Sequence, residues 1–350
     1  MAPRLTIAVD AMGGDQAPGM VVRGLAIAHE RHPNAHFLLF GDEKVVAPLL
    51  SLRFKKAAGD IVTLHHTPDR VADTDKPSVA LRAGRNSSMR LAIDAVADGR
   101  AAGVVSAGNT GALMAMSKMV LKTLEGIDRP AIASIVPTVR GEGVMLDLGA
   151  NIQCDARNLV QVALMGDVFA RTVLGLEKPS VGLLNVGEED LKGHDILREA
   201  AAMLREPGLP IHFQGFVEGN DIWAGNIDVA VTDGFTGNVA LKTAEGVARL
   251  YAGMVRLSFR SSLMSRLGYL LARPGFAKFR KRVDPRRYNG AMFLGLNGIA
   301  IKSHGGTDAF GFANAVGVAV DLVAQDFNRH IIEGLKRFSD SLNASRKAVV

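Results

Sequence analysis

Six short turns rich in glycine carry most of the residues in this sequence that could do chemistry. Each turn follows an apolar, strand-like run and holds small hydroxyls, amides or carboxylates. Backbone N–H groups in glycine-rich turns and at helix N-termini bind anions such as phosphate. Together the turns therefore predict a cleft that holds a phosphate-like anion. They span residues 10–15, 106–111, 147–151, 185–193, 233–238 and 304–308.

Two of these turns are predicted to open helices. The first, Ser106–Gly111, follows the run Gly103–Val105, and the second, Asp233–Asn238, follows Val229–Thr232. Glycine lets the backbone approach a ligand closely, and a new helix offers free N–H groups. The same residue types also cap helices without binding anything, so both roles stay open. The candidate binding residues here are Ser106, Asn109, Thr110, Gly111, Gly234, Thr236 and Gly237.

Carboxylates flank the first turn, where Asp10 and Asp15 enclose Met12-Gly13-Gly14. A carboxylate at a strand end can bind a metal, act as a base or orient neighbouring N–H groups. A purely structural Asp turn fits the pattern equally well. We treat Asp10, Asp15, Gly13 and Gly14 as candidate site residues.

Lys192 follows three carboxylates, at residues 188–190, in the fourth turn. Its ammonium group would neutralise a phosphate or polarise a carbonyl, and the alternative is a solvated acidic loop. The single cysteine, Cys154, excludes a disulfide within the chain and CxxC-type metal sites. A free cysteine is usually a small buried hydrophobe, which is the role we expect for Cys154. No metal site is predicted.

Strand-like runs alternate with helix-period stretches of 10–20 residues along the chain. This alternation predicts a mostly parallel α/β sheet with helices on both faces, a Rossmann-like fold, in one domain over residues 1–350. In such sheets ligands bind beyond the carboxyl ends of the strands, where the six turns lie. The sequence lacks GxGxxG, GxxxxGK[ST], GxSxG and HExxH, so we expect no nucleotide cofactor and favour free phosphate or a phosphorylated metabolite.

Charge is concentrated in one segment. Between Arg249 and Arg287 there are eleven Lys or Arg residues and one acid, a net charge of +10, whereas the whole chain carries +6 and the remainder therefore −4. Residues 252–289 are predicted to form one or two short amphipathic helices that protrude from the body and face an anionic partner. The chain starts without the apolar region of a signal peptide and has no bilayer-spanning run, which predicts a cytoplasmic protein.

The motifs resemble those of the bacterial phosphate acyltransferase (PlsX) family of phospholipid synthesis, nearly end to end and in order. The matching stretches are 9–15, 87–89, 105–115, 147–151, 184–190 with Lys192-Gly193, 215–219, 231–238 and 305–308. The resemblance implies a fold related to phosphotransacetylases and isopropylmalate-dehydrogenase-like enzymes. It implies transfer of a long acyl chain from acyl carrier protein to inorganic phosphate, with no nucleotide or other cofactor, by a homodimer that supplies a membrane glycerol-3-phosphate acyltransferase.

Phosphate is itself a nucleophile, so the enzyme must hold it against the thioester and stabilise the oxyanion. We expect N–H groups of the first two turns to bind phosphate, and Lys192, Asn238 and Thr236 to contact phosphate or the thioester oxygen. Asp10, Asp15 and Asp233 would orient these loops or accept a proton. The predicted catalytic residues are Lys192, Asn238, Asp233 and Asp10; the predicted substrate-binding residues are Gly13, Gly14, Asp15, Ser106, Asn109, Thr110, Gly111, Asn151, Gly234, Thr236 and Gly237.

Other functions and contacts remain open at this stage. The protein would alternatively be a phosphotransacetylase that uses short acyl-CoA, or a lipid- or metabolite-binding regulator without catalysis. The basic segment, or Arg82 and Arg85, would dock the acidic carrier protein, and the apolar residues of the segment would enter an anionic membrane surface or form the dimer interface. The remainder of the chain carries a net negative charge, so we expect no nucleic-acid partner.

Overall fold

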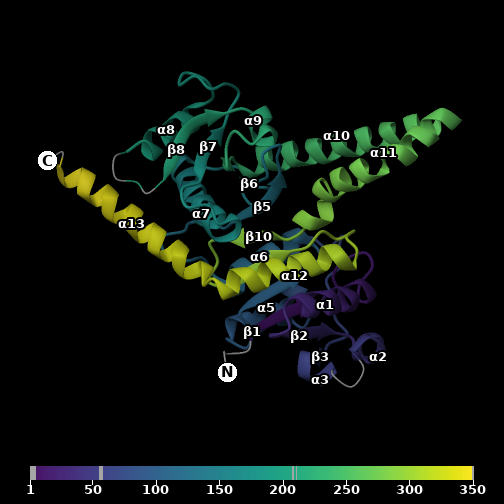
Figure 1. The fold of residues 1–350 in the computed structure, drawn as a ribbon. Coiled ribbons are helices and arrows are strands. Elements are labelled where there is room, and N and C mark those ends of the chain that lie inside the picture. Colours follow the sequence, from purple (N-terminus) through teal and green to yellow (C-terminus); the bar gives the residue numbers. More distant parts are fainter. Residues whose placement is uncertain (1–4, 55–57, 207–208, 210, 349–350) are drawn as a thin grey trace.

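The computed structural model describes residues 5–54, 58–206, 209 and 211–348 and contains an 11-stranded sheet covered by helices on both faces (Figure 1). Residues 1–4, which precede the expected first strand Leu5–Val9, lie outside the described part. The strand order is β3-β2-β1-β4-β11-β10-β5-β6-β9-β7-β8. The strands are β1 (Leu5–Asp10), β2 (Ala35–Gly41), β3 (Val62–His66), β4 (Gly103–Ser106), β5 (Ala131–Pro137), β6 (Glu142–Leu146), β7 (Ser180–Leu184), β8 (His212–Val217), β9 (Val229–Val231), β10 (Ala291–Leu294) and β11 (Ile299–Lys302).

Helices connect most of these strands, as the alternation in the sequence predicts. They are α1 (Gly19–Arg31), α2 (Glu43–Phe54), α3 (Ala58–Ile61), α4 (Pro77–Ala83), α5 (Ser88–Ala97), α6 (Thr110–Leu121), α7 (Ala156–Leu174), α8 (Asp195–Leu204), α9 (Gly219–Ala224), α10 (Gly234–Arg260), α11 (Leu263–Arg282), the 3-10 helix η2 (Pro285–Tyr288), α12 (Ala309–Ala324) and α13 (Phe327–Ala348).

The sheet consists of two parallel blocks that run in opposite directions. The first block is β3, β2, β1, β4 and β11, and the second is β6, β9, β7 and β8. Between them β10 pairs antiparallel with β11 and β5, and β5 pairs antiparallel with β6, which reverses the direction of the second block. The mostly parallel sheet is confirmed. The expectation that all six turns share one edge is wrong, because the carboxyl ends of the two blocks lie at opposite edges.

Each face of the sheet has its own apolar core, as alternating side chains on the strands require. On β1, Ile7 and Val9 pack into one cluster and Ala8 into the other. The first cluster includes residues of α1, α7, α8 and α12, and the second includes residues of α5, α6 and α9. Because both faces of the sheet are packed in this way, the strand ends that carry the candidate site residues are held in place.

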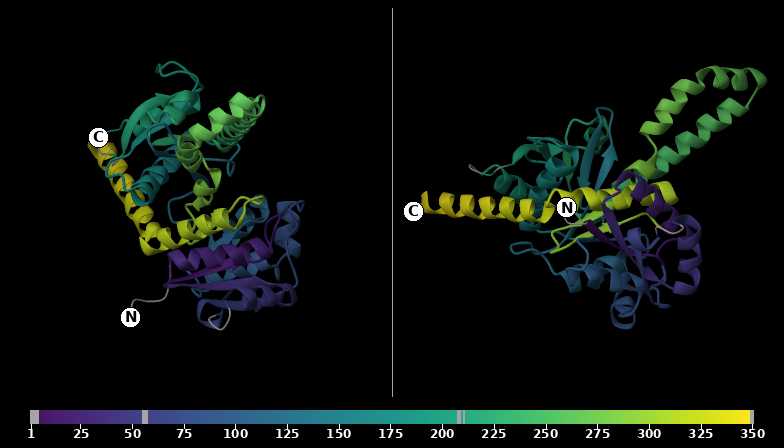
Figure 2. Two further views of the ribbon diagram at one scale, coloured as in Figure 1. Left: turned by 45° about the vertical axis from the view of Figure 1, so that its right-hand side comes forward. Right: turned by 60° about the horizontal axis from the view of Figure 1, so that its bottom comes forward.

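Most of the basic segment belongs to two long helices that extend from the body as a hairpin, and its last two arginines lie in η2 (Figures 1 and 2). The expected short helices within residues 252–289 are wrong in their bounds. Helix α10 begins at Gly234 and runs without a break to Arg260, and α11 continues through Pro274 to Arg282. Helix α10 continues past Gly253 because a single glycine costs only about 1 kcal/mol in a helix. No helix of the described residues is long and apolar enough to cross a membrane.

Candidate functional site

The carboxylate of Asp10 organises the turn that follows β1. It is 2% exposed and accepts hydrogen bonds from Ser88 Oγ (2.6 Å), Ser106 Oγ (2.7 Å) and the N–H of Met12 (3.1 Å). Burial raises the pKa of Asp10, and the surrounding donors, which also include the N–H of Gly13, lower it in part. The predicted site residues Asp10 and Ser106 are therefore in direct contact, and the buried carboxylate of Asp10 holds the turn by accepting hydrogen bonds from it.

The turn at Gly13 and Gly14 packs directly against the turn between β4 and α6. A methyl group on Gly13 would lie 2.5 Å from the nitrogen of Gly108, and Gly14 has a φ of +102°, in the region that favours glycine. The N–H of Asp15 donates to Gly305 O (3.0 Å), which ties the same turn to the loop after β11. Three turns of the first block thus meet at one edge of the sheet.

The N-terminus of α6 lies at this same edge of the sheet. Asn109 caps it by accepting a hydrogen bond from the N–H of Ala112 (3.0 Å), while the first-turn N–H groups of Thr110 and Gly111 have no partner within the helix. The Asn109 amide donates to Asp73 O (3.0 Å) and Asp75 O (2.8 Å). Its side chain is therefore a cap and a link to the loop at residues 72–75, and the free N–H groups beside it are those that can bind an anion.

Lys302, which the sequence reasoning missed, brings positive charge to the same place. It ends β11, and its ammonium group donates to Ala107 O (3.2 Å) and to the carbonyl of Ser303. Burial lowers the pKa of Lys302 to about 8, against the opposing influence of Asp73, Asp10 and Asp15. A signal was available in the sequence, since this lysine directly follows the apolar run Gly298–Ile301 and precedes a glycine-rich turn.

The turns of the second block form a separate network around Asp147. Its fully buried carboxylate accepts hydrogen bonds from the N–H groups of Ile132 (2.9 Å) and Asn151 (2.7 Å) and from the Asn151 side chain (2.9 Å). The N–H of Gly234 donates to Asn151 O (2.7 Å), and a methyl group on Gly237 would overlap the carbonyl oxygen of Asp147. These predicted binding residues thus hold the start of α10 against the end of β6.

The first turn of α10 is capped from within. Asp233 accepts hydrogen bonds from the N–H (2.9 Å) and the hydroxyl (2.7 Å) of Thr236. Asn238 donates from its amide to Leu148 O (3.0 Å). Asp233, and not Thr236, is therefore the N-cap of α10, and the capping role left open for Thr236 is wrong because Thr236 is the donor. Asn238 is exposed near the start of the helix.

Helix α10 brings the second block close to the first. Lys242 lies one turn beyond Asn238, and its charge helps to lower the pKa of Lys302 and of His304, for both of which burial is the larger cause. Glu245, which pairs with Lys242 (3.0 Å), raises the pKa of His304. The two networks are therefore joined by charges on α10 and not by a shared sheet edge.

Lys192 lies in the loop after β7, apart from these contacts. Its backbone carbonyl accepts from Asn185 Nδ2 (3.2 Å), while the described residues provide no hydrogen bond or ion pair for its ammonium group. The structure does not bring Lys192 together with the first-block turns. For Cys154, burial raises the pKa to about 11, so it is protonated at neutral pH, as expected of a cysteine without a nucleophilic role.

Relatives place this arrangement in a family. A family model described as "Fatty acid synthesis protein" matches residues 5–330. The phosphate acyltransferase of Rhodospirillum centenum is 65% identical over 345 residues, 99% of this chain and 97% of that protein. The phosphate acyltransferase of Paramagnetospirillum magneticum is 62% identical over 331 residues, 95% and 94% of the two chains. The class is thus that of lipid-synthesis enzymes. The chain belongs to the phosphate acyltransferase family and is an acyltransferase, which excludes the non-catalytic regulator considered above.

Solved structures confirm the fold class. A phosphotransacetylase from Streptococcus pyogenes superposes with a TM-score of 0.63 at 15% identity, covering 93% of this chain and 95% of that chain. EutD phosphotransacetylase from Staphylococcus aureus gives 0.59 at 16% identity, with 91% and 94% covered. At these identities the likeness concerns the fold alone.

Proposed function

We propose that the protein transfers a long acyl chain from acyl carrier protein to inorganic phosphate, which yields acyl phosphate and free carrier protein. The observation that carries the proposal is the position of Lys302, whose ammonium group lies against the β4–α6 turn, beside the N-terminus of α6. A cation and free backbone N–H groups at one point are suited to an anion.

Phosphate would bind between the Gly13-Gly14 turn and the start of α6. The N–H groups of Gly14, Thr110 and Gly111 would donate to its oxygens, and Lys302 would balance its charge. Asp10 would act from behind as a positioning residue, because its carboxylate already accepts bonds from two serine hydroxyls and the turn itself. Holding phosphate against the thioester in this way removes about 7–11 kcal/mol from the barrier.

The transfer then needs no acylated residue. A phosphate oxygen attacks the thioester carbon, the C–O bond forms, and collapse of the oxyanion breaks the C–S bond. The leaving thiolate takes up a proton, and the proton on the attacking phosphate passes to a nearby carboxylate or water. Asp15 and Asp73, whose negative charges raise the pKa of Lys302, are the carboxylates on this side of the site.

We assign the thioester side of the site to the second block. Asn238 and Lys192 would contact the thioester oxygen, and Asp233 would keep the first turn of α10 in shape. Support comes from Lys242, which lies one helical turn after Asn238 on α10. Its positive charge helps to lower the pKa of Lys302. This assignment requires Lys192 to approach the other residues when substrate binds.

Acyl phosphate formation by purified Lys302→Met tests the site. We expect a loss of about 10²–10³-fold, the usual effect of removing one oxyanion-stabilising group. Lys118→Met on the exposed side of α6 is the matched control and should retain full activity. An unimpaired Lys302→Met protein would remove the proposed phosphate site, while the family assignment would stand.

The donor is proposed to be a carrier-protein thioester because the surface at the base of the hairpin is strongly basic. Lys278, Arg280 and Arg287 are exposed there, and a carrier protein with an acidic surface would be attracted to them. A comparison of long-chain acyl carrier protein with acetyl-CoA separates this proposal from the phosphotransacetylase alternative. A clear preference for acetyl-CoA would contradict the proposal.

We propose that the protein is a cytoplasmic homodimer and that the hairpin of α10 and α11 contacts the inner face of the membrane. Apolar side chains are exposed along the hairpin, with Leu263 82% and Met264 76% exposed at the start of α11. Such a basic, apolar surface binds anionic lipid headgroups and inserts its apolar residues. The location would suit delivery of acyl phosphate to a membrane glycerol-3-phosphate acyltransferase. No nucleic-acid partner is proposed.

Co-sedimentation with vesicles tests the membrane contact. We expect the protein to bind vesicles that contain anionic lipid and to bind neutral vesicles weakly. A Leu263→Ser, Met264→Ser variant should bind less, while Leu52→Ser, which changes an exposed leucine on α2, should bind as the unmodified protein does. Equal binding to neutral and anionic vesicles would contradict the proposal.

A further inference from the structure

The turn after β11, at residues 303–306, lies against the proposed phosphate site, and no catalytic role has been assigned to it. The N–H of Asp15 donates to Gly305 O (3.0 Å), which ties this turn to the turn after β1. A methyl group on Gly306 would lie 3.2 Å from Asp15 Oδ2 and 3.6 Å from His304 Cε1. The imidazole of His304 and the carboxylate of Asp15 therefore lie close to the same point.

The backbone of His304 is fixed by the side chain of Asn289, which is buried. The N–H of His304 donates to Asn289 Oδ1 (2.8 Å). The amide nitrogen of Asn289 donates to Ser303 Oγ (2.8 Å) and to Gly311 O (2.7 Å), so both ends of the amide are engaged. The N–H of Ser303 donates to Ser106 O (2.9 Å), which joins the segment to the end of β4. A side chain on backbone held in this way is suited to a precise role.

The contacts of the His304 ring fix the position of its proton. The N–H of Gly306 donates to His304 Nδ1 (3.1 Å), so Nδ1 is an acceptor and carries no proton. A neutral imidazole then carries its proton on Nε2. In the part of the chain that the structure describes, Nε2 has no hydrogen-bond partner, and His304 is exposed. The ring therefore has a free donor that a substrate can meet.

The ring of His304 is uncharged near neutral pH. Burial lowers its pKa below the ordinary value of 6.5, and the positive charges of Lys242 and Lys302 lower it further. The negative charges of Glu245 and Asp15 raise the pKa in part. A neutral ring donates a hydrogen bond from Nε2 without giving up a proton.

The charges that act on His304 come from both sides of the proposed site. Lys302 belongs to the side assigned to phosphate, whereas Lys242 and Glu245 lie on α10, whose start we assign to the thioester. The ring therefore lies where the two substrates would meet. A neutral donor fixed at such a point stabilises an oxyanion as it forms, because it needs no rearrangement.

We propose that His304 is a further catalytic residue, whose Nε2–H donates a hydrogen bond to the thioester oxygen as negative charge develops on it. This role rests on the proposed function and adds a third group to Asn238 and Lys192 at that oxygen. When a phosphate oxygen attacks, the carbonyl π electrons move to the thioester oxygen, and they return when the C–S bond breaks. The ring keeps its proton throughout. A role as general base does not fit, because Nδ1 accepts from Gly306 and Nε2 already carries the proton.

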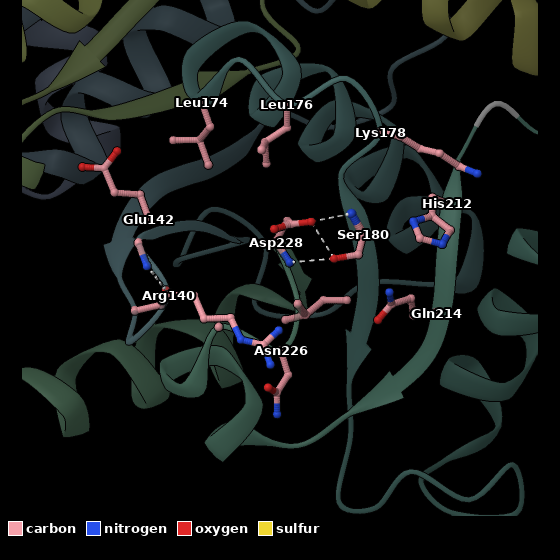
Figure 3. Close-up of a pocket in the computed structure, with 14 residues that line it drawn as sticks. Arg140, Glu142, Leu174, Leu176, Lys178, Ser180, His212, Gln214, Asn226 and Asp228 are labelled. Atoms are coloured by element: carbon pink, nitrogen blue, oxygen red, sulfur yellow. Dashed lines mark hydrogen bonds between the residues drawn. The ribbon is translucent and has the colours of Figure 1, made fainter.

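The cavity of about 530 Å³ shown in Figure 3 offers no comparable group. It lies at the N-terminal ends of β6, β9, β7 and β8. The charged ends of Arg140 and Lys178 lie on opposite sides of it, so one anion cannot contact both. The Nδ1 of His212 has no partner but is buried, so a ligand in the cavity cannot contact it. The cavity therefore adds no group to the transfer reaction.

Two substitutions separate the donor of the ring from its support of the turn. His304→Asn keeps an acceptor near the position of Nδ1 for the N–H of Gly306 but has no polar atom at the position of Nε2. His304→Gln places its amide, which is a donor, near the position of Nε2. His330→Asn, at an exposed histidine on α13, is the matched control. The assay is acyl phosphate formation from phosphate and a long-chain acyl carrier protein.

We expect His304→Asn to lower kcat by about 10²-fold, the usual effect of losing one oxyanion donor, with KM for phosphate little changed. His304→Gln should recover part of the loss, the control should be fully active, and thermal unfolding should show all variants folded. ¹⁵N NMR of the unmodified protein, independent of activity, should show the His304 ring with its proton on Nε2 at neutral pH.

Normal activity of His304→Asn, a raised KM for phosphate with unchanged kcat, or His304→Gln no more active than His304→Asn would overturn the role of His304. A ring with its proton on Nδ1 would also overturn it. Failure of the unmodified protein to form acyl phosphate is a different result, since it would overturn the proposed function and this role together.

Discussion

At the scale of single residues, Gly13 shows how little room there is in the turn after β1, where we propose that phosphate binds. A methyl group there would lie 2.5 Å from Gly108 N and 2.6 Å from Asp10 Oδ2. Gly13→Ala should therefore displace the turn, destabilise the protein by about 1–3 kcal/mol and abolish most activity.

Gly19→Ala is the matched control for this change. Its methyl group would meet only the end of the flexible Arg23 side chain, at 3.5 Å, and it opens helix α1. It should be neutral or stabilising by up to about 1 kcal/mol. Urea unfolding and acyl phosphate assays measure both effects, and equal behaviour of the two variants would show that the turn tolerates displacement.

The charge of Lys302 makes both stability and activity depend on pH, and the two change in opposite directions. Its pKa of about 8 lies below the ordinary lysine value, so the unfolded chain binds the extra proton between that pH and about 10.5. Stability contributed by this group therefore rises with pH across that window, whereas activity that needs the charged ammonium falls above about pH 8.

Lys302→Met should consequently lose activity and gain stability, more at pH 7 than at pH 10. Urea unfolding of both proteins at the two pH values gives the stability difference, and the pH profile of kcat/KM gives the activity limb of the unmodified enzyme. If Lys302→Met were destabilised equally at both pH values, the burial of the charged ammonium group would not be a cost to the stability of the unmodified protein.

At the scale of elements, Asn109 joins the start of α6 to the loop at residues 72–75 by using both ends of its amide. Asn109→Ala loses the cap, which costs about 1 kcal/mol, and also loses the loop contact. Asn109→Asp retains the capping oxygen but has no donor for the loop carbonyls. We expect Asn109→Asp to keep near-normal stability but to loosen the loop at residues 72–75, because its contact with α6 is lost.

Hydrogen exchange at residues 70–76, together with KM for phosphate, separates the two functions of Asn109. Both variants should exchange faster in the loop and show a raised KM, and only Asn109→Ala should unfold at lower urea concentration. Unchanged loop exchange in Asn109→Asp would mean that the loop is held by other contacts.

The elements also show what could be predicted from the sequence. Strand ends and helix starts such as Asp10, Ser106 and Asp233 were predictable because apolar runs end there in polar, glycine-rich turns. The reversal at β5 was not, because the run Ala131–Val136 is the same for either strand direction. The helical period of Phe312–Phe338 predicts one helix, and this prediction is wrong. The structure divides the stretch into α12 and α13 at Asp326, whose φ of +50° no residue pattern signals.

At the scale of the whole molecule, the reversal of strand direction means that the proposed site draws on both halves of the sheet. Asp10, Asn109 and Lys302 come from the first block and its edge. Asn238 lies near the start of α10, which follows β9 of the second block, and only α10 brings it close to the other three residues. Sequence spacing could not show this, since the link between the halves depends on where Lys242 and Glu245 of α10 lie relative to Lys302 and His304.

His304 offers a direct measure of that approach, because two α10 side chains act on its pKa in opposite directions. Lys242 lowers the pKa of His304, in addition to the larger lowering by burial, and Glu245 raises it. Lys242→Met should therefore raise the pKa of His304 and Glu245→Gln should lower it, both less strongly in high salt, because salt screens exposed charges. NMR titration of the His304 ring proton, assigned with His304→Gln, gives both values. If neither substitution shifts the pKa of His304, α10 does not bring the second block close to the turns of the first block, and a site shared by the two halves is ruled out.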